Sequence, residues 1–398
     1  MLNGPFSAWP AYNKEEQDAV LNVLQSNKVN YWTGNEGREF EKEFAAFSDC
    51  QFAVAVANGT VALDLAWKAL SLPHGSEVIV TSRSFMASVS SIVMAGLTPV
   101  FADIDLDSQN LSPETIAPLI NKNTSAILCV HLAGWPCEME PILALAKRHS
   151  IKVVEDCAQA HGAQYRGRSV GSWGDIAAWS FCQDKIMTTA GEGGMVTTND
   201  ERLWSAAWSF KDHGKSYEAV YDREHSPGFR WLHESFGTNW RITEMQSAVG
   251  RYQLTQMPDW HTKRTLNANA IAEACRHFPA LRVPEIPHYV RHAYYKFYAF
   301  IDESLLKGSW SRDSIVAEIS DEGVPCFSGS CSEIYLEKAF DGTGFRPKHA
   351  LKNAHILGKT SIMFLVHPTL TQKEIAHTQD VICKVMQEAS HEYTQSRI

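Results

Sequence analysis

Two residues whose types suit cofactor chemistry lie at the ends of apolar runs. Asp156 closes the run that begins at Val153, and Lys185 lies just beyond a second run that ends at Ser180. A carboxylate set against a pyridine nitrogen keeps that nitrogen protonated, so the ring can draw electrons from a neighbouring carbanion. A lysine amine can hold an aldehyde cofactor as a Schiff base. The pair therefore predicts pyridoxal 5′-phosphate (PLP) chemistry with Lys185 as the catalytic residue.

A turn upstream of this pair suits a phosphate group. Asn58-Gly59-Thr60 joins an apolar strand to an amphipathic helix. The start of a helix offers free N–H groups and the positive end of a dipole, and Gly59 permits close approach. Ser180 adds a hydroxyl at the end of the strand before Lys185. The turn also fits an ordinary capped helix start, and Ser180 also fits a plain strand end.

Other residues suit the ring of such a cofactor. Phe85 opens the helix after the second strand and can stack on a pyridine face. Gln159 follows Asp156 by three positions and can hydrogen-bond a ring hydroxyl. A core aromatic and a surface glutamine are the ordinary alternatives. A glycine cluster beyond Lys185 allows backbone to pass close to a cofactor or forms a flexible turn, and it comprises Gly191, Gly193 and Gly194.

Further polar residues suit a substrate. His131 and His161 can line the same cleft, although both also fit structural histidines. Residues 211–238 show no clear period and are rich in basic and aromatic side chains. We expect Arg230 and Arg241 to bind substrate. The basic side chains can meet a sugar-linked diphosphate or belong to a solvated loop of mixed charge, and they are Lys211, His213, Lys215, Arg223 and Arg230.

The elements that must position these residues alternate between strands and helices. Apolar strands are predicted at 52–57, 77–81, 99–103, 125–130, 152–155, 175–180 and 194–198, with helices between them at 61–72, 85–95, from about 112, and at 139–149. Because the strands are apolar throughout, they predict an α/β fold with a mostly parallel sheet covered by helices on both faces. Helices are also expected within 12–50, from about 199, and at 241–257, 311–322 and 371–388, with a strand at 294–301.

This pattern predicts two domains. Residues 1–258 would form the large domain, including an N-terminal helical segment, and residues 259–398 a smaller α+β domain.

Composition argues against several classes of protein. The formal net charge of -9 argues against a nucleic-acid partner. No apolar run of about 18 residues predicts a membrane span, and the N-terminus lacks the features of a signal peptide. Nine cysteines, an odd number without a C-x-x-C motif, indicate reduced thiols in a cytoplasmic protein. Cys326 and Cys331 could pair or bind a metal, but no second cluster has matching spacing, so no metal is expected.

At these residues the chain resembles the PLP-dependent nucleotide-sugar aminotransferases of the DegT/StrS family. The matching segments are 58–63, 77–80, 155–159, 180–185, 191–194 and 239–244. The resemblance implies fold type I of PLP enzymes, with a large three-layer domain around a mostly parallel seven-stranded sheet and a small C-terminal domain. One departure precedes the lysine. Gln183-Asp184 stands where Pro-Thr or similar is usual, and an inward Asp184 carboxylate could alter the pKa of Lys185.

The resemblance also implies a role for each matching residue. Lys185 would hold PLP covalently, Asp156 would bind the pyridine nitrogen and Gln159 the ring hydroxyl. The remaining cofactor contacts would be Gly59, Thr60 and Ser180 at the phosphate, Phe85 stacked on the ring, and Asn239 at the phosphate in the other subunit. That last role implies a homodimer with shared active sites.

The expected function is transfer of an amino group from glutamate to a keto sugar. The sugar would be nucleotide-linked, a 3- or 4-keto-deoxysugar used for polysaccharide, lipopolysaccharide or natural-product biosynthesis. A PLP-dependent dehydratase is the first alternative, because Ala8-Trp9-Pro10 and residues 185–188 are similar to 3-amino-5-hydroxybenzoate synthases. A non-catalytic protein on the same scaffold is the second alternative. Some relatives replace the lysine with histidine and deoxygenate sugars, and Lys185 argues against that branch.

Overall fold

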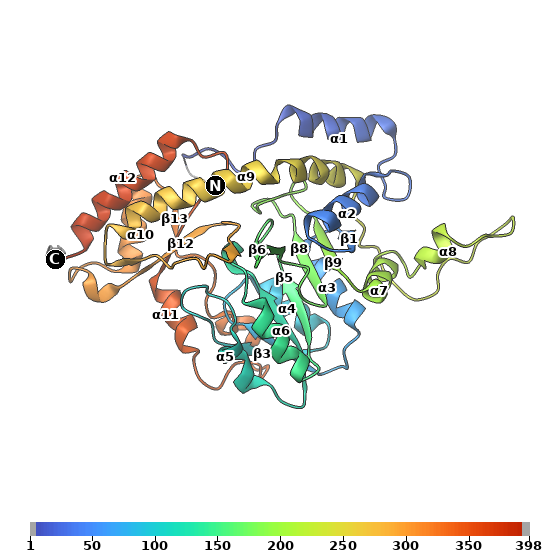
Figure 1. Cartoon of the computed structure of the whole chain (residues 1–398), viewed down its shortest axis with the longest axis horizontal. Helices are drawn as coiled ribbons and strands as arrows, with labels where there is room; N and C mark the ends of the chain where they lie inside the picture. Colours follow the sequence, from blue (N-terminus) through green and yellow to red (C-terminus); the bar gives the residue numbers. More distant parts are fainter. Residues whose placement is uncertain (1–4, 392–398) are drawn as a thin grey trace.

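A seven-stranded sheet forms the centre of the chain (Figure 1). The structure is a computed structural model that describes residues 5–391. Residues 1–4, part of the segment considered for a signal peptide, and residues 392–398 lie outside the described range. The strand order is β1-β9-β8-β5-β4-β2-β3, with bounds β1 Phe52–Val56, β2 Glu77–Thr81, β3 Thr98–Ala102, β4 Thr124–Val130, β5 Lys152–Asp156, β8 Ile176–Ser180 and β9 Gly194–Thr198. Only β9 runs antiparallel to its neighbours, so the predicted mostly parallel sheet is confirmed.

Both faces of this sheet are apolar and covered by helices. Val54 and Val80 pack on one face, whereas their neighbours Ala53 and Ile79 pack on the other. The first face is covered by α3 (Gly59–Leu70), α4 (Met86–Met94) and α7 (Glu201–Lys211). The second is covered by α2 (Glu36–Phe47), α6 (Met139–Arg148) and part of α9 (Glu244–Arg276). Burial on both sides explains why these strands read as continuous apolar runs.

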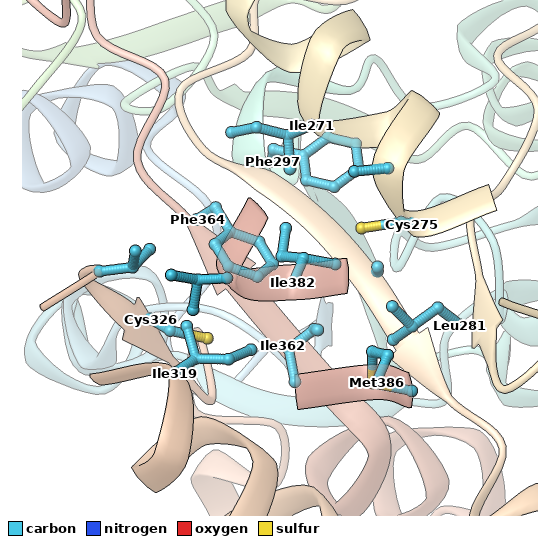
Figure 2. Close-up of a cluster of buried hydrophobic side chains, with 14 of the residues drawn as sticks. Ile271, Cys275, Leu281, Phe297, Ile319, Cys326, Ile362, Phe364, Ile382 and Met386 are labelled. Atoms are coloured by element: carbon cyan, nitrogen blue, oxygen red, sulfur yellow. The ribbon is translucent and has the colours of Figure 1, made fainter. Parts of the chain in front are cut away.

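The C-terminal part of the chain builds a second, antiparallel sheet. Its order is β10-β12-β14-β13, with bounds β10 Leu281–Arg282, β12 Phe297–Ile301, β13 Cys326–Phe327 and β14 Ser361–Phe364. Figure 2 shows the apolar core between this sheet and its helices, with Ile271 and Cys275 from α9 facing Phe297 and Phe364. The other helices in this region are α10 (Arg312–Asp321), α11 (Lys352–Thr360) and α12 (Gln372–Ala389).

Smaller elements complete the described chain. A three-stranded sheet consists of β6 (Gln164–Tyr165), β7 (Arg168–Ser169) and β11 (Val290–Arg291). The remaining helices are α1 (Lys14–Ser26), α5 (Pro113–Ile116) and α8 (Tyr217–Tyr221). Short 3₁₀ turns lie at Ala117–Leu119, Leu132–Gly134, Glu303–Leu305, Ile334–Leu336 and Lys338–Phe340. Between residues 5 and 391, no helix is both long enough and apolar enough to cross a bilayer.

The predicted domain boundary at 258/259 falls inside one helix. α9 continues through Pro258 to Arg276, packing on α1 and α2 at its start and on the C-terminal core at its end. A helix of 33 residues therefore belongs to both units. The division of the chain into two domains stays a prediction.

The functional segments all reach one edge of the central sheet. β2, β4, β5 and β8 are parallel, so the residues that follow them leave at the same edge. Val56 at the end of β1 pairs with Gly194, and so does Ser180 at the end of β8. The sheet thus brings the turn at 58–60, Asp156, Ser180 and the glycine cluster to this edge.

Lys211 is a buried ion-pair residue and not a substrate contact. Its side chain is fully buried, its Nζ donates to Glu41 Oε1 at 2.8 Å and lies 3.9 Å from the centre of the Tyr31 ring. Glu41 also accepts hydrogen bonds from the Tyr31 hydroxyl and the Ala55 N–H group. Neither of the two interpretations left open for Lys211, a diphosphate contact or a solvated loop residue, fits this position, because its ammonium is buried against Glu41.

Replacing Lys211 tests this role. Lys211→Met leaves the Glu41 carboxylate buried without its counter-ion, so we expect the free energy of unfolding to fall by about 3–5 kcal/mol. The neighbouring surface pair of Lys42 with Glu39 supplies the control, and Lys42→Met should change stability by less than about 1 kcal/mol. Urea unfolding followed by circular dichroism measures both. Equal effects of the two substitutions would contradict the assignment.

Candidate active site

A cavity of about 1020 Å³ lies between the edge of the central sheet and the C-terminal unit. Its wall brings together seven residues singled out from the sequence: Gly59, Thr60, Phe85, Asp156, Gln159, Ser180 and Lys185. The opposite wall comes from the C-terminal unit and includes Tyr295, Lys296, Tyr298 and Ser330. The volume is that of a site for a cofactor together with a second molecule.

Asp156 enters the cavity as a buried carboxylate with two donors. It ends β5, and Ser88 Oγ donates to its Oδ2 at 2.7 Å while the Ala158 N–H group donates to its Oδ1 at 3.1 Å. Burial raises the pKa of Asp156, and these two hydrogen bonds and the nearby Lys185 charge oppose the rise. The carboxylate therefore favours a cationic partner in the cavity.

The start of α3 forms a narrow cradle with the end of β8. Asn58 caps the helix, its Oδ1 accepting from the Val61 N–H group at 2.9 Å. This leaves the N–H groups of the first helical residues, Gly59 and Thr60, directed out of the helix. A Cβ on Gly59 would lie 2.5 Å from Ser180 Cβ, so only glycine allows this approach. The cradle is a site for an anion.

Two further residues present a flat wall and a polar edge. Phe85 stands at the N-cap position of α4 and is 70% exposed, which excludes the core alternative. Gln159 Oε1 accepts from the Ala133 N–H group at 2.8 Å, which leaves its amide N–H₂ available as a donor.

Lys185 faces residues of both units. The Trp9 indole N–H group donates to its carbonyl at 2.8 Å, and its Nζ lies 5.1 Å from the centre of the Tyr295 ring. The neighbouring Asp184 does turn inward, and its Oδ2 accepts from the Tyr295 hydroxyl at 2.5 Å. Burial opposes ionisation of Asp184, but the Lys185 charge and this hydrogen bond prevail and lower its pKa.

His131 lies behind the cavity, not in it. Its Nδ1 accepts from the Cys137 N–H group and its Nε2 donates to Glu155, both at 3.0 Å, and the side chain is fully buried. Glu155 also accepts from the N–H groups of Gly171, Trp173 and Gly174. Both ring nitrogens are thus occupied, and the structure gives His131 a structural role in place of the predicted substrate contact. Cys157 lies beside His131 and Glu155 in one buried cluster. The Glu155 carboxylate of this cluster already accepts hydrogen bonds from His131 and the three backbone groups.

His161 is likewise buried away from the cavity. Its ring packs among those of Phe44, Trp179 and Phe181. Burial lowers the pKa of His161 to about 3, so the imidazole stays neutral at ordinary pH. It fits a structural histidine and does not line the cleft as a charged group.

The two arginines expected to bind substrate, Arg230 and Arg241, do not line this chain's cavity. Arg241 Nη1 donates to the buried Asp212 at 2.6 Å. Lys215 and Arg223 are also paired within the segment, with Asp212 and Glu234. Arg230 and Asn239 are exposed. Figure 1 shows the chain after α8 projecting away from the body at the right of the view.

Several residues at the site were missed from the sequence. Ser88 lies three positions after Phe85 in α4, so helical spacing alone could have placed it beside the same cavity. Tyr295 and Lys296 come from the C-terminal unit and carry no local signal that links them to Lys185. The nine cysteines are all free, Cys326 and Cys331 included.

Comparison with known proteins identifies the scaffold. A sequence model of the DegT/DnrJ/EryC1/StrS aminotransferase family matches residues 10–385. GDP-perosamine synthase of Escherichia coli O157:H7 is 40% identical over 255 residues, 64% of this chain and 67% of that protein. The spore coat polysaccharide biosynthesis protein SpsC of Bacillus subtilis is 36% identical over 320 residues, 80% of each chain.

Solved structures agree with this match. An aminotransferase from Psychrobacter cryohalolentis superposes with a TM-score of 0.95 at 58% identity, covering 96% of this chain and 99% of its own. A 3-amino-5-hydroxybenzoic acid synthase superposes with a TM-score of 0.85 at 26% identity, covering 97% of this chain and all of its own. The family match, the fold and the cavity agree: the chain belongs to the DegT/DnrJ/EryC1/StrS family and is a PLP-dependent aminotransferase of fold type I.

Proposed function

We propose that the enzyme moves an amino group from glutamate to a keto sugar carried on a nucleotide. The observation that carries this proposal is one cavity in which Lys185, Asp156 and the anion cradle of α3 face each other with room beyond them. The match to GDP-perosamine synthase supports a nucleotide-linked 3- or 4-keto-deoxysugar, and the match to SpsC supports a role in polysaccharide biosynthesis.

The residues of the cavity fit PLP. The cradle of Gly59, Thr60 and Ser180 suits the phosphate of PLP. The absence of a Cβ at Gly59 leaves the helix N-terminus open beside Ser180, where an anion can approach the N–H groups. Phe85 offers an exposed ring for stacking and the Gln159 amide a donor for the ring hydroxyl. Asp156 supplies the negative charge that a protonated ring nitrogen requires. When bound there, PLP supplies an electron sink for the α-carbon of the amino donor.

Lys185 would act twice in this reaction. Its amine would hold the cofactor covalently and, once freed by the amino donor, would carry the proton that leaves the donor α-carbon. Trp9 holds the Lys185 carbonyl, and the Tyr295 ring lies beside the ammonium. These contacts restrict the position of Lys185 and would help to hold its amine beside the reacting carbon.

Exposed aromatic side chains support a homodimer with shared sites. Phe229, Trp231 and Phe236 are 76%, 78% and 99% exposed on the projecting segment. Large apolar side chains that stand free on an arm of the chain suit burial against a second copy. Asn239, exposed at the base of this arm, is then the residue that reaches the phosphate of the partner's cofactor.

Narrowing the cradle should weaken cofactor binding. In Gly59→Ala the new methyl group meets Ser180, which displaces the start of α3, and we expect PLP affinity to fall at least about tenfold. Titration of the apoprotein with PLP, followed by absorbance, measures this change. Gly308→Ala is the control, because an added Cβ there meets nothing within 4 Å. Unchanged affinity in Gly59→Ala would contradict the phosphate assignment.

Removing the lysine amine should abolish turnover. Lys185→Ala loses both covalent attachment and proton transfer, so we expect formation of 2-oxoglutarate from glutamate to fall by at least about 10³-fold. Lys185→Arg keeps the positive charge but should not restore the rate, because a guanidinium does not form the Schiff base. An unchanged rate in either variant refutes the role. Product formed by the wild type without any amino donor would favour the dehydratase alternative.

Mixed dimers test the shared site. Lys185→Ala and Asn239→Ala subunits should each be impaired alone, whereas a heterodimer of the two contains one site with both native residues. Random mixing in equal amounts should therefore recover about a quarter of wild-type activity in a symmetric dimer. The readout is the glutamate-dependent rate after subunit exchange. No recovery above the separate variants would show that Asn239 does not act on the partner's site.

A further inference from the structure

Lys296 lies in the cavity wall and has no role in the reaction proposed above. It lies immediately before β12, lines the cavity with Lys185, and is partly buried. Its Nζ lies 4.7 Å from the centre of the Tyr295 ring. Within residues 5–391 it makes no hydrogen bond, and no carboxylate oxygen lies within 4 Å of it. A cation held there without an ion-pair partner suits an anionic ligand.

A strained turn lies immediately before Lys296 in the chain. Tyr294 has a φ of +49°, a left-handed conformation that is unfavourable for an aromatic residue. Hydrogen bonds on either side hold it, from the Ala293 N–H group to the Gly134 carbonyl and from the Tyr295 N–H group to the Ala133 carbonyl, both 2.9 Å. Arg264 Nη1 donates to the Tyr294 carbonyl at 3.2 Å. Strain that the surroundings enforce in this way marks functional segments, and here it directs residues 295 and 296 into the cavity.

The charges of the cavity wall single out Lys296. Its carboxylates are Asp156, Asp184, Glu192 and Glu337, and its cations in the described chain are Lys185 and Lys296 alone. Lys185 is committed to the cofactor in the proposed function, on which this step rests. A glutamate donor brings two carboxylates into this acidic surrounding. We propose that Lys296 binds a carboxylate of the amino-acid donor.

The position of Lys296 suits that ligand. The ammonium groups of Lys185 and Lys296 both lie against the Tyr295 ring, so they are at most the sum of their two ring distances apart, about 10 Å. The α-carboxylate of an amino acid is two bonds from the amine that replaces Lys185, and the side-chain carboxylate lies further along the same chain. A donor that reacts at Lys185 can therefore place one of its carboxylates within reach of Lys296.

The local charges leave Lys296 able to act as a cation. Burial lowers the pKa of Lys296 to about 8. The charge of Asp184 opposes this decrease, whereas the charges of Arg264 and Lys185 lower the pKa further. The ammonium form therefore still predominates at neutral pH. Asp184 acts on Lys296 through its charge but forms no ion pair with it, and the Asp184 Oδ2 accepts from the Tyr295 hydroxyl.

Calorimetric titration with glutarate tests the site apart from catalysis. Glutarate has the two carboxylates of glutamate but no amine, so it cannot react with the cofactor. We expect Lys296→Met holoenzyme to bind glutarate roughly ten- to a hundredfold more weakly than the wild type, and Lys296→Arg to retain binding. Lys373→Met, on the exposed start of α12, is the control and should bind like the wild type. Wild-type affinity in Lys296→Met would overturn the proposal, as would a wild type that does not bind glutarate.

The two half-reactions separate this proposal from the proposed function. In Lys296→Met the KM for glutamate should rise by the same factor, while reaction of the keto sugar with the aminated enzyme stays unchanged. A loss confined to the sugar half-reaction would place Lys296 at the sugar and overturn the proposal. If wild-type enzyme does not react with glutamate, the proposed donor fails instead. Should Lys296→Met fold poorly, Lys296→Gln, which keeps a polar side chain of similar length, gives the decisive titration.

Discussion

A carboxylate buried at the end of β5 is the constraint on which the site depends. Asp156 must remain ionised in a place where burial raises its pKa. Ser88 and the Ala158 N–H group stabilise the charge in part, and a cationic ring nitrogen would complete the balance. The pairing of β5 with β4 and β8 fixes where this carboxylate lies, and the Asp156 carbonyl accepts from the His131 N–H group at 3.2 Å.

The elements behind the site keep that strand end in place. Glu155, next to Asp156, accepts from three backbone N–H groups and from His131, so this buried carboxylate fixes the loop at 171–174 against β5. The C-terminal unit then closes the cavity from the other side through Tyr295, which contacts both Asp184 and Lys185. Chemistry at Lys185 therefore depends on residues that are more than 100 positions away in the sequence.

Residues whose placement follows from local structure could be predicted from the sequence. Asp156 and Ser180 end strands, Gly59 starts a helix, and parallel strands bring their carboxyl ends to one edge.

Placement that depends on a distant partner could not be predicted from the sequence. Lys211 looked like a basic loop residue because its partner, Glu41, lies 170 positions away, and Arg241 is held by Asp212 across an irregular turn. His131 has a suitable position in the sequence, but its two ring nitrogens are used by Cys137 and Glu155. The predicted division at 258/259 lies at a change in the sequence pattern. The helix α9 continues across that position without a break.

The protonation state of the bound ring nitrogen tests the central claim most directly. With PLP labelled by ¹⁵N at the ring, nuclear magnetic resonance of the wild-type enzyme should show a protonated nitrogen throughout the neutral pH range. The same signal in Asp156→Asn should move to the unprotonated position, because the neutral amide cannot balance the charge. An unprotonated ring nitrogen in the wild type, or a protonated one that survives in Asp156→Asn, would contradict the account.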